Sequence, residues 1–457
     1  MSLQRAGTLL RGVLSRSARI ACGIALAGDV HAIDLLDLYR LALATDPVYL
    51  TARATAAGGR EVLPQALAGL LPQVSANYSR SRNSTDQSTQ GFIPGTINSR
   101  RLEYPAIASS INLRQPVIRL VNVAGYQSAQ AQVVAVEAVL AHELQSVALR
   151  VAGSYFDTLV ASSKVAVVVA QRESYRGQLA AADRAMANGF GTRTDIDDAK
   201  ARFDVASAQE IEARHNLRVA ERSLSGIVNQ RIRADTLAGI DAARLRLELP
   251  DPPDVDSWMS HAELNNPQLQ ALRASVQAAE REVDKNRAGH LPTLDLAMSR
   301  SNNDSDTNTS IGSKYLTTSV GLQLNIPLYA GGQIDSAVRQ SRANLDKARQ
   351  QFEAGKRQIE TEVEKEFGAV ETGFARIRAL EQAERSAEQA VLSSRKGVDA
   401  GTRNSVDVLN ALQLFAATKQ ELIQSRYTYA FDQLKLAAAA GSLGESGIAT
   451  INAWLSR

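Results

Sequence analysis

Two very long stretches of this chain contain no proline, and this feature limits the possible folds more than any other. Prolines are absent from residues 117–249 and again after Pro327. Because proline breaks helix interiors, each stretch can hold unusually long helices. We expect each to form a helix of roughly 60–70 residues and a returning helix, joined by a turn at the permissive backbone of Gly189 or Gly401. At 1.5 Å per residue the longer helix is about 100 Å long, far more than a globular core requires.

Apolar residues recur at three- and four-residue steps inside both stretches. This spacing is typical of the seam of a coiled coil. The positions are Leu140, Leu144, Val147, Val151 and Tyr155 in the first stretch, and Ile359, Val363, Phe367, Val370, Phe374 and Ile377 in the second. The sequence therefore predicts two long antiparallel helical hairpins.

The two halves of the chain are similar to each other. A shift of 220 residues places the segment GLLPQVSANYSRSRN on GHLPTLDLAMSRSNN. Farther on, a shift of 212 pairs Gly189 with Gly401 and Asp195 with Asp407, although a shift of 210 would overlay two GTR triplets instead. An internal repeat of this length indicates one structural plan that is built twice.

The segment LELPDPPDVDS, residues 247–257, is the natural linker between the two repeats because prolines and acids crowd into it. We expect the first repeat at residues 33–249 and the second at residues 250–457. Each repeat should hold one β-hairpin followed by one helical hairpin.

Residues 1–32 have the features of a secretory signal peptide. Four arginines precede an apolar core at residues 20–28, and Val30 and Ala32 occupy the −3 and −1 positions of a cleavage site. An amphipathic first helix is the alternative. The apolar core is too short to span a bilayer, so we do not expect a permanent anchor. The only cysteine, Cys22, leaves with this segment, and Arg19 argues against lipidation of Cys22 because an apolar residue is expected at that position.

The charge of the mature chain excludes one class of partner. Removal of the signal takes four arginines and Asp29 from the 51 basic and 48 acidic residues, which leaves 47 of each. No overall basic field remains to attract nucleic acid, so we expect no nucleic-acid partner. An exported chain without thiols also cannot depend on disulfides or thiolate chemistry.

Before each helical stretch, apolar and polar residues alternate with a period of two. Alternation over about ten residues is the signature of a strand with one apolar face. The alternating positions are Val74, Ala76 and Tyr78; Ile107, Ile111 and Leu113; Leu294, Leu296 and Met298; and Val320, Leu322, Leu324 and Ile326. We expect polar loops between the paired strands, namely RSRNSTDQSTQGFIPGTINSRRLEY and RSNNDSDTNTSIGSK. The chain should thus have four strands.

Four strands beside long helices could form a small soluble sheet. The export signal, the strand length and the polar loops together favour strands that cross a membrane. In lipid an open sheet edge leaves backbone groups without partners, and four strands are too few to close a barrel. Copies of the chain must therefore complete the barrel. Two copies would give eight strands filled by side chains, and three would give twelve strands around an aqueous lumen.

Several segments resemble the TolC family of bacterial outer-membrane channel-tunnel proteins. In chain order they are LYRLALATDP, LPQVSANYSRS, GHLPTLDL, GTRNSVDVLNA and KQELIQSRYTYAFDQLKL. The resemblance extends across essentially the whole mature chain. High alanine and arginine usage is similar to that of the outer-membrane partners of toxin-exporting type I systems, including the cyclolysin exporter.

This resemblance implies a mainly α-helical fold with a membrane β-barrel portion. In such a homotrimer, a twelve-stranded barrel in the outer membrane continues as a barrel of antiparallel coiled-coil hairpins across the periplasm. The barrel faces outer-membrane lipid. An inner-membrane ABC transporter, or another pump, and a periplasmic adaptor would dock at the far end.

The resemblance also implies a gate at the hairpin tips, where aspartates line the constriction. Asp407 matches the first gate aspartate of the second hairpin, whereas Asn410 replaces the second, so the ring should carry less negative charge than the family pattern. Asp198 lies on the same helix face as Asp195 and could restore some of this charge. A negative ring favours cations over small anions. The residues alone indicate a simpler role for Asp407, the capping of a returning helix, and the two roles are compatible.

A second set of tip residues matches the polar network that holds neighbouring hairpins shut. Arg403 occupies the position of the tip arginine, and Thr194 with Asp195 matches the Thr-Asp pair of the partner side. The tyrosine and glutamate that complete the latch in the family fall on Val398 and Arg395 here. This departure leaves the closing contacts open.

The sequence offers no constellation for catalysis, and we expect no enzyme activity, cofactor or metal. The histidines of the mature chain, His142, His215, His261 and His290, are scattered without metal-ligand spacing. Neither a phosphate-binding loop nor a nucleophile elbow is present. The energy for transport must therefore come from a partner.

The sequence thus predicts a passive outer-membrane exit duct, and type I secretion of a protein such as a toxin is the favoured role. One alternative is the outer-membrane component of a small-molecule or multidrug efflux pump. An alternative of another class is a periplasmic coiled-coil adaptor or scaffold without a pore. We expect cargo specificity to lie with the pump and the adaptor.

Overall fold

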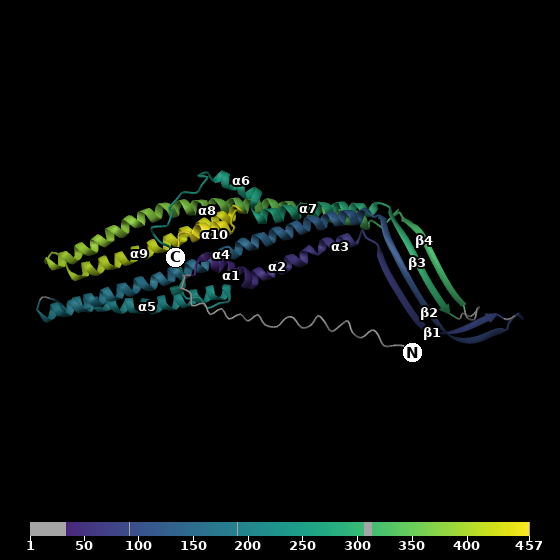
Figure 1. Cartoon of the computed structure of the whole chain (residues 1–457), viewed down its shortest axis with the longest axis horizontal. Helices are drawn as coiled ribbons and strands as arrows, with labels where there is room; N and C mark the ends of the chain where they lie inside the picture. Colours follow the sequence, from purple (N-terminus) through teal and green to yellow (C-terminus); the bar gives the residue numbers. More distant parts are fainter. Residues whose placement is uncertain (1–32, 91, 190, 306–312, 457) are drawn as a thin grey trace, which may run out of the picture.

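The computed structural model describes residues 33–90, 92–189, 191–305 and 313–456. The molecule is elongated: a sheet lies at one end, two helical hairpins reach the other end, and short helices surround the middle (Figure 1). The signal-peptide prediction for residues 1–32 falls outside the described residues, as does the centre of the second polar loop, residues 306–312.

The two helical hairpins have the predicted lengths. Helix α4 (Leu120–Ala187) has 68 residues and α8 (Gln333–Asp399) has 67. Each is followed by a returning helix, α5 (Arg193–Val228) and α9 (Ser405–Ala439). The α8 seam is confirmed because Ile359, Val363, Phe367, Val370 and Ile377 are buried, and Phe374 packs against the same core. Among the described helices, α4 alone has a window apolar enough by composition to cross a membrane, and it packs here against α5, α7 and α9.

Shorter helices precede each hairpin in the same order. They are α1 (Leu35–Thr45), α2 (Pro47–Arg60) and α3 (Val62–Ala68) in the first half, and α6 (Val255–Asn265) and α7 (Pro267–Arg287) in the second, with α10 (Glu445–Asn452) near the C-terminus. Both α2 and α7 begin with proline behind a capping residue, Asp46 or Asn266. Proline suits this position because the first helical N–H needs no intrahelical partner. The 220-residue shift of the sequence thus relates elements that start in the same way.

The four predicted strands form one antiparallel sheet in the order β1-β2-β3-β4. The strands are β1 (Gln73–Gln90), β2 (Ile97–Ile118), β3 (Thr293–Ser305) and β4 (Ser313–Asn325). The expectation of a polar loop over residues 80–104 was wrong, because β1 and β2 pair through most of it. The loop expected over residues 300–314 was also too long, because residues 300–305 belong to β3 and residues 313–314 to β4. Opposite charges on adjacent strands stabilise this extension: Arg101 binds Asp86 at 2.7 Å and Arg82 binds Glu103 at 2.9 Å.

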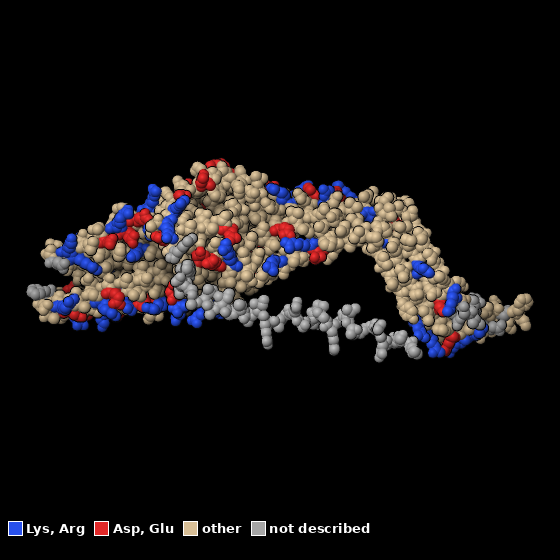
Figure 2. Space-filling view, in the orientation of Figure 1, with Lys and Arg blue, Asp and Glu red and all other residues tan. Residues whose placement is uncertain are grey.

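The register separates an apolar face of the sheet from a polar one. Val74, Leu113, Met298 and Val320 lie side by side across the four strands. On the opposite face the neighbouring row consists of Ser75, Asn112, Ser299 and Ser319. The apolar row is exposed to the surroundings, with 66% of Val74 and 61% of Val320 accessible. Figure 2 shows few charged side chains on the part of the sheet next to the helices and a cluster of them farther out, where the strands bend before their outermost end.

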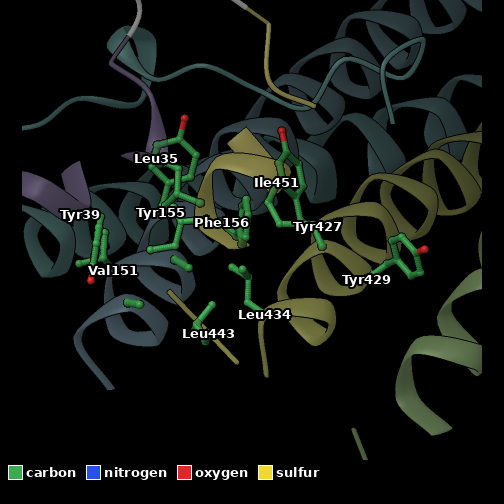
Figure 3. Packing of buried hydrophobic residues seen from close by; sticks show 14 of the residues in the cluster. Leu35, Tyr39, Val151, Tyr155, Phe156, Tyr427, Tyr429, Leu434, Leu443 and Ile451 are labelled. Carbon is green, nitrogen blue, oxygen red and sulfur yellow. The ribbon is translucent and has the colours of Figure 1, made fainter. Parts of the chain in front are cut away.

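A dense core lies at the middle of the molecule, where α1, α4, α9 and α10 meet (Figure 3). Tyr155 and Tyr429 are fully buried there, and the Tyr155 hydroxyl donates to the carbonyl of Ala238 at 2.6 Å. Burial raises the pKa of Tyr155. The Tyr429 hydroxyl likewise donates to the carbonyl of Glu248 at 2.6 Å. These bonds fix the irregular segment between the two halves on the same core from which both hairpins extend.

Candidate functional site at the helical hairpin tips

The first tip depends on two glycines. Gly189 has a φ of +79°, a conformation that glycine adopts without the steric cost of a side chain. Gly191 needs space for a different reason, because a Cβ there would lie 2.7 Å from the backbone nitrogen of Met186. The turn after α4 therefore requires glycine at both positions.

A capping box starts the returning helix α5. The backbone N–H of Thr192 donates to Asp195 Oδ2 at 3.0 Å, and the backbone N–H of Asp195 donates to Thr192 Oγ1 at 3.2 Å. The Thr192 hydroxyl also donates to the same carboxylate at 2.6 Å. The hydrogen bonds from Thr192, together with one from Ser405, lower the pKa of Asp195. Asp195 is thus held as an anion at the start of the helix, where the helix dipole also favours negative charge.

The second tip repeats this arrangement. Gly401 has a φ of +71°, and the Asn404 side chain accepts from the backbone N–H of Asp407 at 2.9 Å. Asp407 Oδ2 accepts in return from the backbone N–H of Asn404 at 3.1 Å. The capping role of Asp407 is confirmed. The two tips also align Gly189 with Gly401 in the same left-handed conformation, which settles the ambiguous register in favour of the 212-residue shift.

Direct hydrogen bonds join the two tips within one chain. The Ser405 hydroxyl donates to Asp195 Oδ1 at 2.7 Å. Two helical turns farther along, Arg202 donates to Asn410 Oδ1 and to Gln413 Oε1, each at 2.7 Å. Asn410, the residue that replaces the second gate aspartate, is therefore a hydrogen-bond acceptor for an arginine of the other hairpin.

The other predicted tip residues lie at the surface. Thr194 and Asp198 are exposed in the first two turns of α5. Arg403 donates to Ser394 Oγ at 2.7 Å, a contact within its own hairpin, and its side chain packs over Gly397. The predicted contacts of Thr194 and Arg403 with neighbouring hairpins thus remain predictions.

Sequence reasoning missed several residues of this site, among them Thr192, Asn404, Ser405 and Arg202. A local signal was available for the first two, because each stands three residues before an aspartate at the start of a helix, as in a capping box. Ser405 and Arg202 carry no such signal. Their roles depend on the contact between two segments that lie about two hundred residues apart in the chain.

A cavity of about 440 Å³ lies between the hairpins farther from the tips. It is bordered by Val167 and Gln171 of α4, Arg395 of α8, and Leu412 and Phe415 of α9. Val398, the other departure from the latch pattern, is 37% exposed. The cavity separates the two hairpins between the tips and the central core.

The tip chemistry is that of hydrogen bonding and fixed charge. No group of three metal-binding side chains was found among the described residues. The tip carboxylates are held by backbone and hydroxyl donors, so they present oriented negative charge. Such a group can attract cations, and copies arranged around an axis would bring several of these groups together.

The model of one protein family, described as "Outer membrane efflux protein", matches residues 38–230 and 258–442. These two matched ranges include both hairpins, both tips and all four strands.

Individual proteins match over nearly the whole chain. The alkaline protease secretion protein AprF of Pseudomonas aeruginosa is 32% identical over 94% of this chain and 88% of its own length. The outer membrane protein TolC of Escherichia coli K12 is 28% identical over 96% of this chain and 89% of its own length. In fold, the chain is similar to the outer-membrane channel OprN, with a TM-score of 0.76 at 16% identity over 89% of this chain and 90% of that one.

Proposed function

The chain belongs to the outer membrane efflux protein family and is an outer-membrane protein that extends into the periplasm, and we propose that it is the passive exit duct of a type I protein secretion system. The secretion of a protein is supported by the similarity to AprF, whose name describes the secretion of an alkaline protease. The family is a transport family, and we infer that this chain has no catalytic activity and needs no cofactor.

The sheet is the observation that carries this proposal. Its apolar face is exposed on β1, where Val74 is 66% accessible, and on β4, where Leu322 and Leu324 are 68% and 59% accessible. Strands β1 and β4 also leave two edges unpaired within the chain. Lipid suits the apolar face, but unpaired backbone groups are costly in lipid. A homotrimer meets both requirements, because twelve strands close into a barrel whose polar face lines the lumen.

The hairpins give the duct its length. Helices of 68 and 67 residues extend about 100 Å, which suits a conduit that crosses the periplasm. The tips would then lie where an inner-membrane ABC transporter and a periplasmic adaptor dock. We also infer that residues 1–32 are removed on export and that residues 33–249 and 250–457 are the two structural repeats.

The tips are the gate in this proposal. Asp407 and Asp195 contribute negative charge to the constriction, with Asp198 as a further candidate. Asn410 contributes no charge and instead accepts from Arg202. Thr194 and Arg403 take part in closing contacts between neighbouring hairpins, and Gly189 and Gly401 form the turns.

Planar lipid bilayers provide the test. The purified protein should conduct ions, and divalent cations added on the tip side should block the current. Asp407→Ala should weaken this block, whereas Asp256→Ala, which changes an acid in the first turn of α6, should leave it unchanged. A protein that stays in solution without detergent and never conducts would instead indicate a periplasmic scaffold without a pore.

Efflux of small molecules is the second candidate, because the description of the matching family names efflux. Photo-crosslinking from Thr402 at the second tip can separate the two roles in cells. Capture of an ABC transporter complex that exports a protein would support secretion. Capture of a drug-efflux adaptor, without any protein exporter, would overturn the secretion proposal.

A further inference from the structure

Helices α6 and α7 pack against the first part of α8, where Lys356 pairs with Glu263 and Arg349 with Glu280. Closer to the tips, the four long helices of one chain form a row with two free edges. Helix α4 packs against α5 on one side and α9 on the other, and α9 packs in turn against α8. The order across the row is therefore α5-α4-α9-α8, and the two hairpins lie side by side in Figure 1. When copies of the chain close into a ring, α5 of one copy must meet α8 of the next.

The free flank of α5 is strongly basic in its second half. Arg214, Arg218 and Arg222 follow one another at four-residue steps and are exposed. Together with Arg231 and Arg233 of the following segment, they line a cavity of about 900 Å³. Arg202, which binds α9, lies on the opposite flank of α5, so these arginines point away from the second hairpin of their own chain.

Much of this positive charge has no partner in the described part of the chain. Arg214 pairs with Glu210 and Arg233 with Asp235. Glu221, which also lines the cavity, accepts from the backbone N–H of Ala234. No ion pair joins Arg218, Arg222 or Arg231 to any described residue. The cavity thus offers several free guanidinium groups to an acidic partner.

The free flank of α8 carries the complementary charge. Glu353, Glu360, Glu364 and Glu371 fall within about 40° of one another around the helix axis. This stripe lies opposite the residues that face α9, such as Glu366, which contacts Lys435 of α9. None of the four glutamates forms an ion pair with a described residue.

The two charged flanks lie at overlapping heights. The bond between Ser405 and Asp195 sets the tips of the two hairpins level. From these tips, the segment from Arg214 to Arg222 is about 30–45 Å away, and Arg231 lies beyond it. Glu371 is about 42 Å from the end of α8 and is level with Arg222. Glu364, at about 52 Å, is level with the last turn of α5 beside Arg231, and Glu360 follows at about 58 Å, just past the end of α5.

We propose that the arginine-lined cavity on α5 is the docking surface for the glutamate stripe on α8 of a second copy of this chain. This proposal rests on the proposed function, in which copies of the chain close into a ring. Exposed ion pairs are individually weak, but a network of them fixes the register and orientation of two surfaces. The pairing would therefore select how neighbouring copies align along their helices.

Charge reversal on each flank provides the test. One variant carries Arg214→Glu, Arg218→Glu and Arg222→Glu, a second carries Glu360→Arg, Glu364→Arg and Glu371→Arg, and a third combines all six changes. In detergent, the temperature at which the oligomer dissociates should fall in the first two variants and recover in the third, where every interface again joins opposite charges. Glu212→Arg, on another flank of α5, is the control and should have no effect.

Two further measurements distinguish the loss of charge pairing from misfolding of a variant. Circular dichroism checks that the hairpins of each variant are helical, and Arg→Gln changes at the three α5 positions should lower the dissociation temperature in the same direction by a smaller amount. Unchanged oligomers in both reversed variants, or no recovery in the combined one, would overturn this pairing. A wild-type protein that forms no oligomer and no conducting pore would instead refute the proposed function itself.

Discussion

The two halves of the chain have nearly equal helices but unequal strands. Helices α4 and α8 have 68 and 67 residues, and α5 and α9 have 36 and 35. In contrast, β1 and β2 have 18 and 22 residues, whereas β3 and β4 have 13 each. The helical hairpins therefore have the same length in both halves, whereas the lengths of the strands differ.

The contacts at each end explain this difference. At the tips, Ser405 of one hairpin binds Asp195 of the other, which requires both hairpins to reach the same level. At the other end, the extra length of β1 and β2 carries exposed charged pairs such as Arg82 with Glu103, which water can also solvate. About ten residues suffice for a strand to cross the bilayer, so the remainder is free of that constraint.

The strongest test of this comparison shortens one hairpin alone. Deletion of residues 167–173 from α4 and 207–213 from α5 removes one heptad from each arm and shortens the first hairpin by about 10 Å. The tips can then no longer meet, so the bonds of Ser405 and Arg202 should be lost. Spin labels at Thr194 and Thr402 should report a separation larger by about 10 Å.

The matched control also removes one heptad from each arm of the second hairpin, residues 380–386 and 420–426. With both hairpins shortened equally, the tips should meet again and the label separation should return to the wild-type value. A separation that stays unchanged after the first deletion alone would contradict the idea that hairpin length is fixed by the tips.

The second test compares one glycine from each tip. Gly191→Ala should destabilise its turn by about 2–3 kcal/mol, because the new Cβ meets the backbone of Met186 and forces it to move. Gly401→Ala has open space around it and should cost only about 1–2 kcal/mol for the left-handed conformation. Hydrogen exchange of the tip amides measures both values, and equal losses would show that the two turns are constrained alike.

The third test separates the two capping aspartates. Asp407→Ala should cost about 1 kcal/mol, the usual value of a lost helix cap. Asp195→Ala should cost about 1 kcal/mol more, because it also removes the bond to Ser405. Thermal unfolding monitored by a probe at the tips provides the comparison, with Asp256→Ala as the control.

The pH dependence of the first tip follows from the same bonds. The donors Thr192 and Ser405 lower the pKa of Asp195 in the folded state. Its stabilising effect is therefore complete above the ordinary aspartate pKa of about 3.9 and is lost as the pH falls through the lower folded value. Protection of tip amides should be constant between about pH 8 and pH 5 and should fall below about pH 4. Asp195→Ala should remove this loss of protection at low pH. If tip-amide protection in the variant falls by the same amount below about pH 4, groups other than Asp195 cause the loss.

The smallest effect is expected from the strands. Replacement of residues 83–104 by an Asn-Gly turn leaves residues 73–82 paired with residues 105–114, which is still long enough to cross a bilayer. Oligomer formation and single-channel conductance should remain close to the wild-type values. A variant that no longer inserts into lipid would show that the strand extension is required for the barrel.

The helices could be predicted from the sequence because their signals are local. Proline-free stretches and an apolar seam, such as Val363 with Val370, depend only on neighbours along the chain. The extended parts of β1 and β2 were missed because segments rich in Ser, Asn and Arg are typical of loops. Their pairing depends on partners across the strand, as for Asp86 and Arg101.

The same distinction applies to the tips. The resemblance to a known family singled out Asp407 and Asp195, and a local pattern could have found their capping partners. The bond from Ser405 to Asp195 and those from Arg202 could not be predicted, because nothing in a single sequence says which turn of one hairpin faces which turn of the other.

The bonds between the two tips of one chain also determine how many parts can move. A force applied to either hairpin end is passed to the other through Ser405 and Arg202. In a trimer the two hairpin ends of each subunit would then move together, so the six ends would form three moving units. Widening of the passage would occur at the boundaries between subunits. A partner that binds one hairpin end of each subunit would then be enough to open the whole aperture.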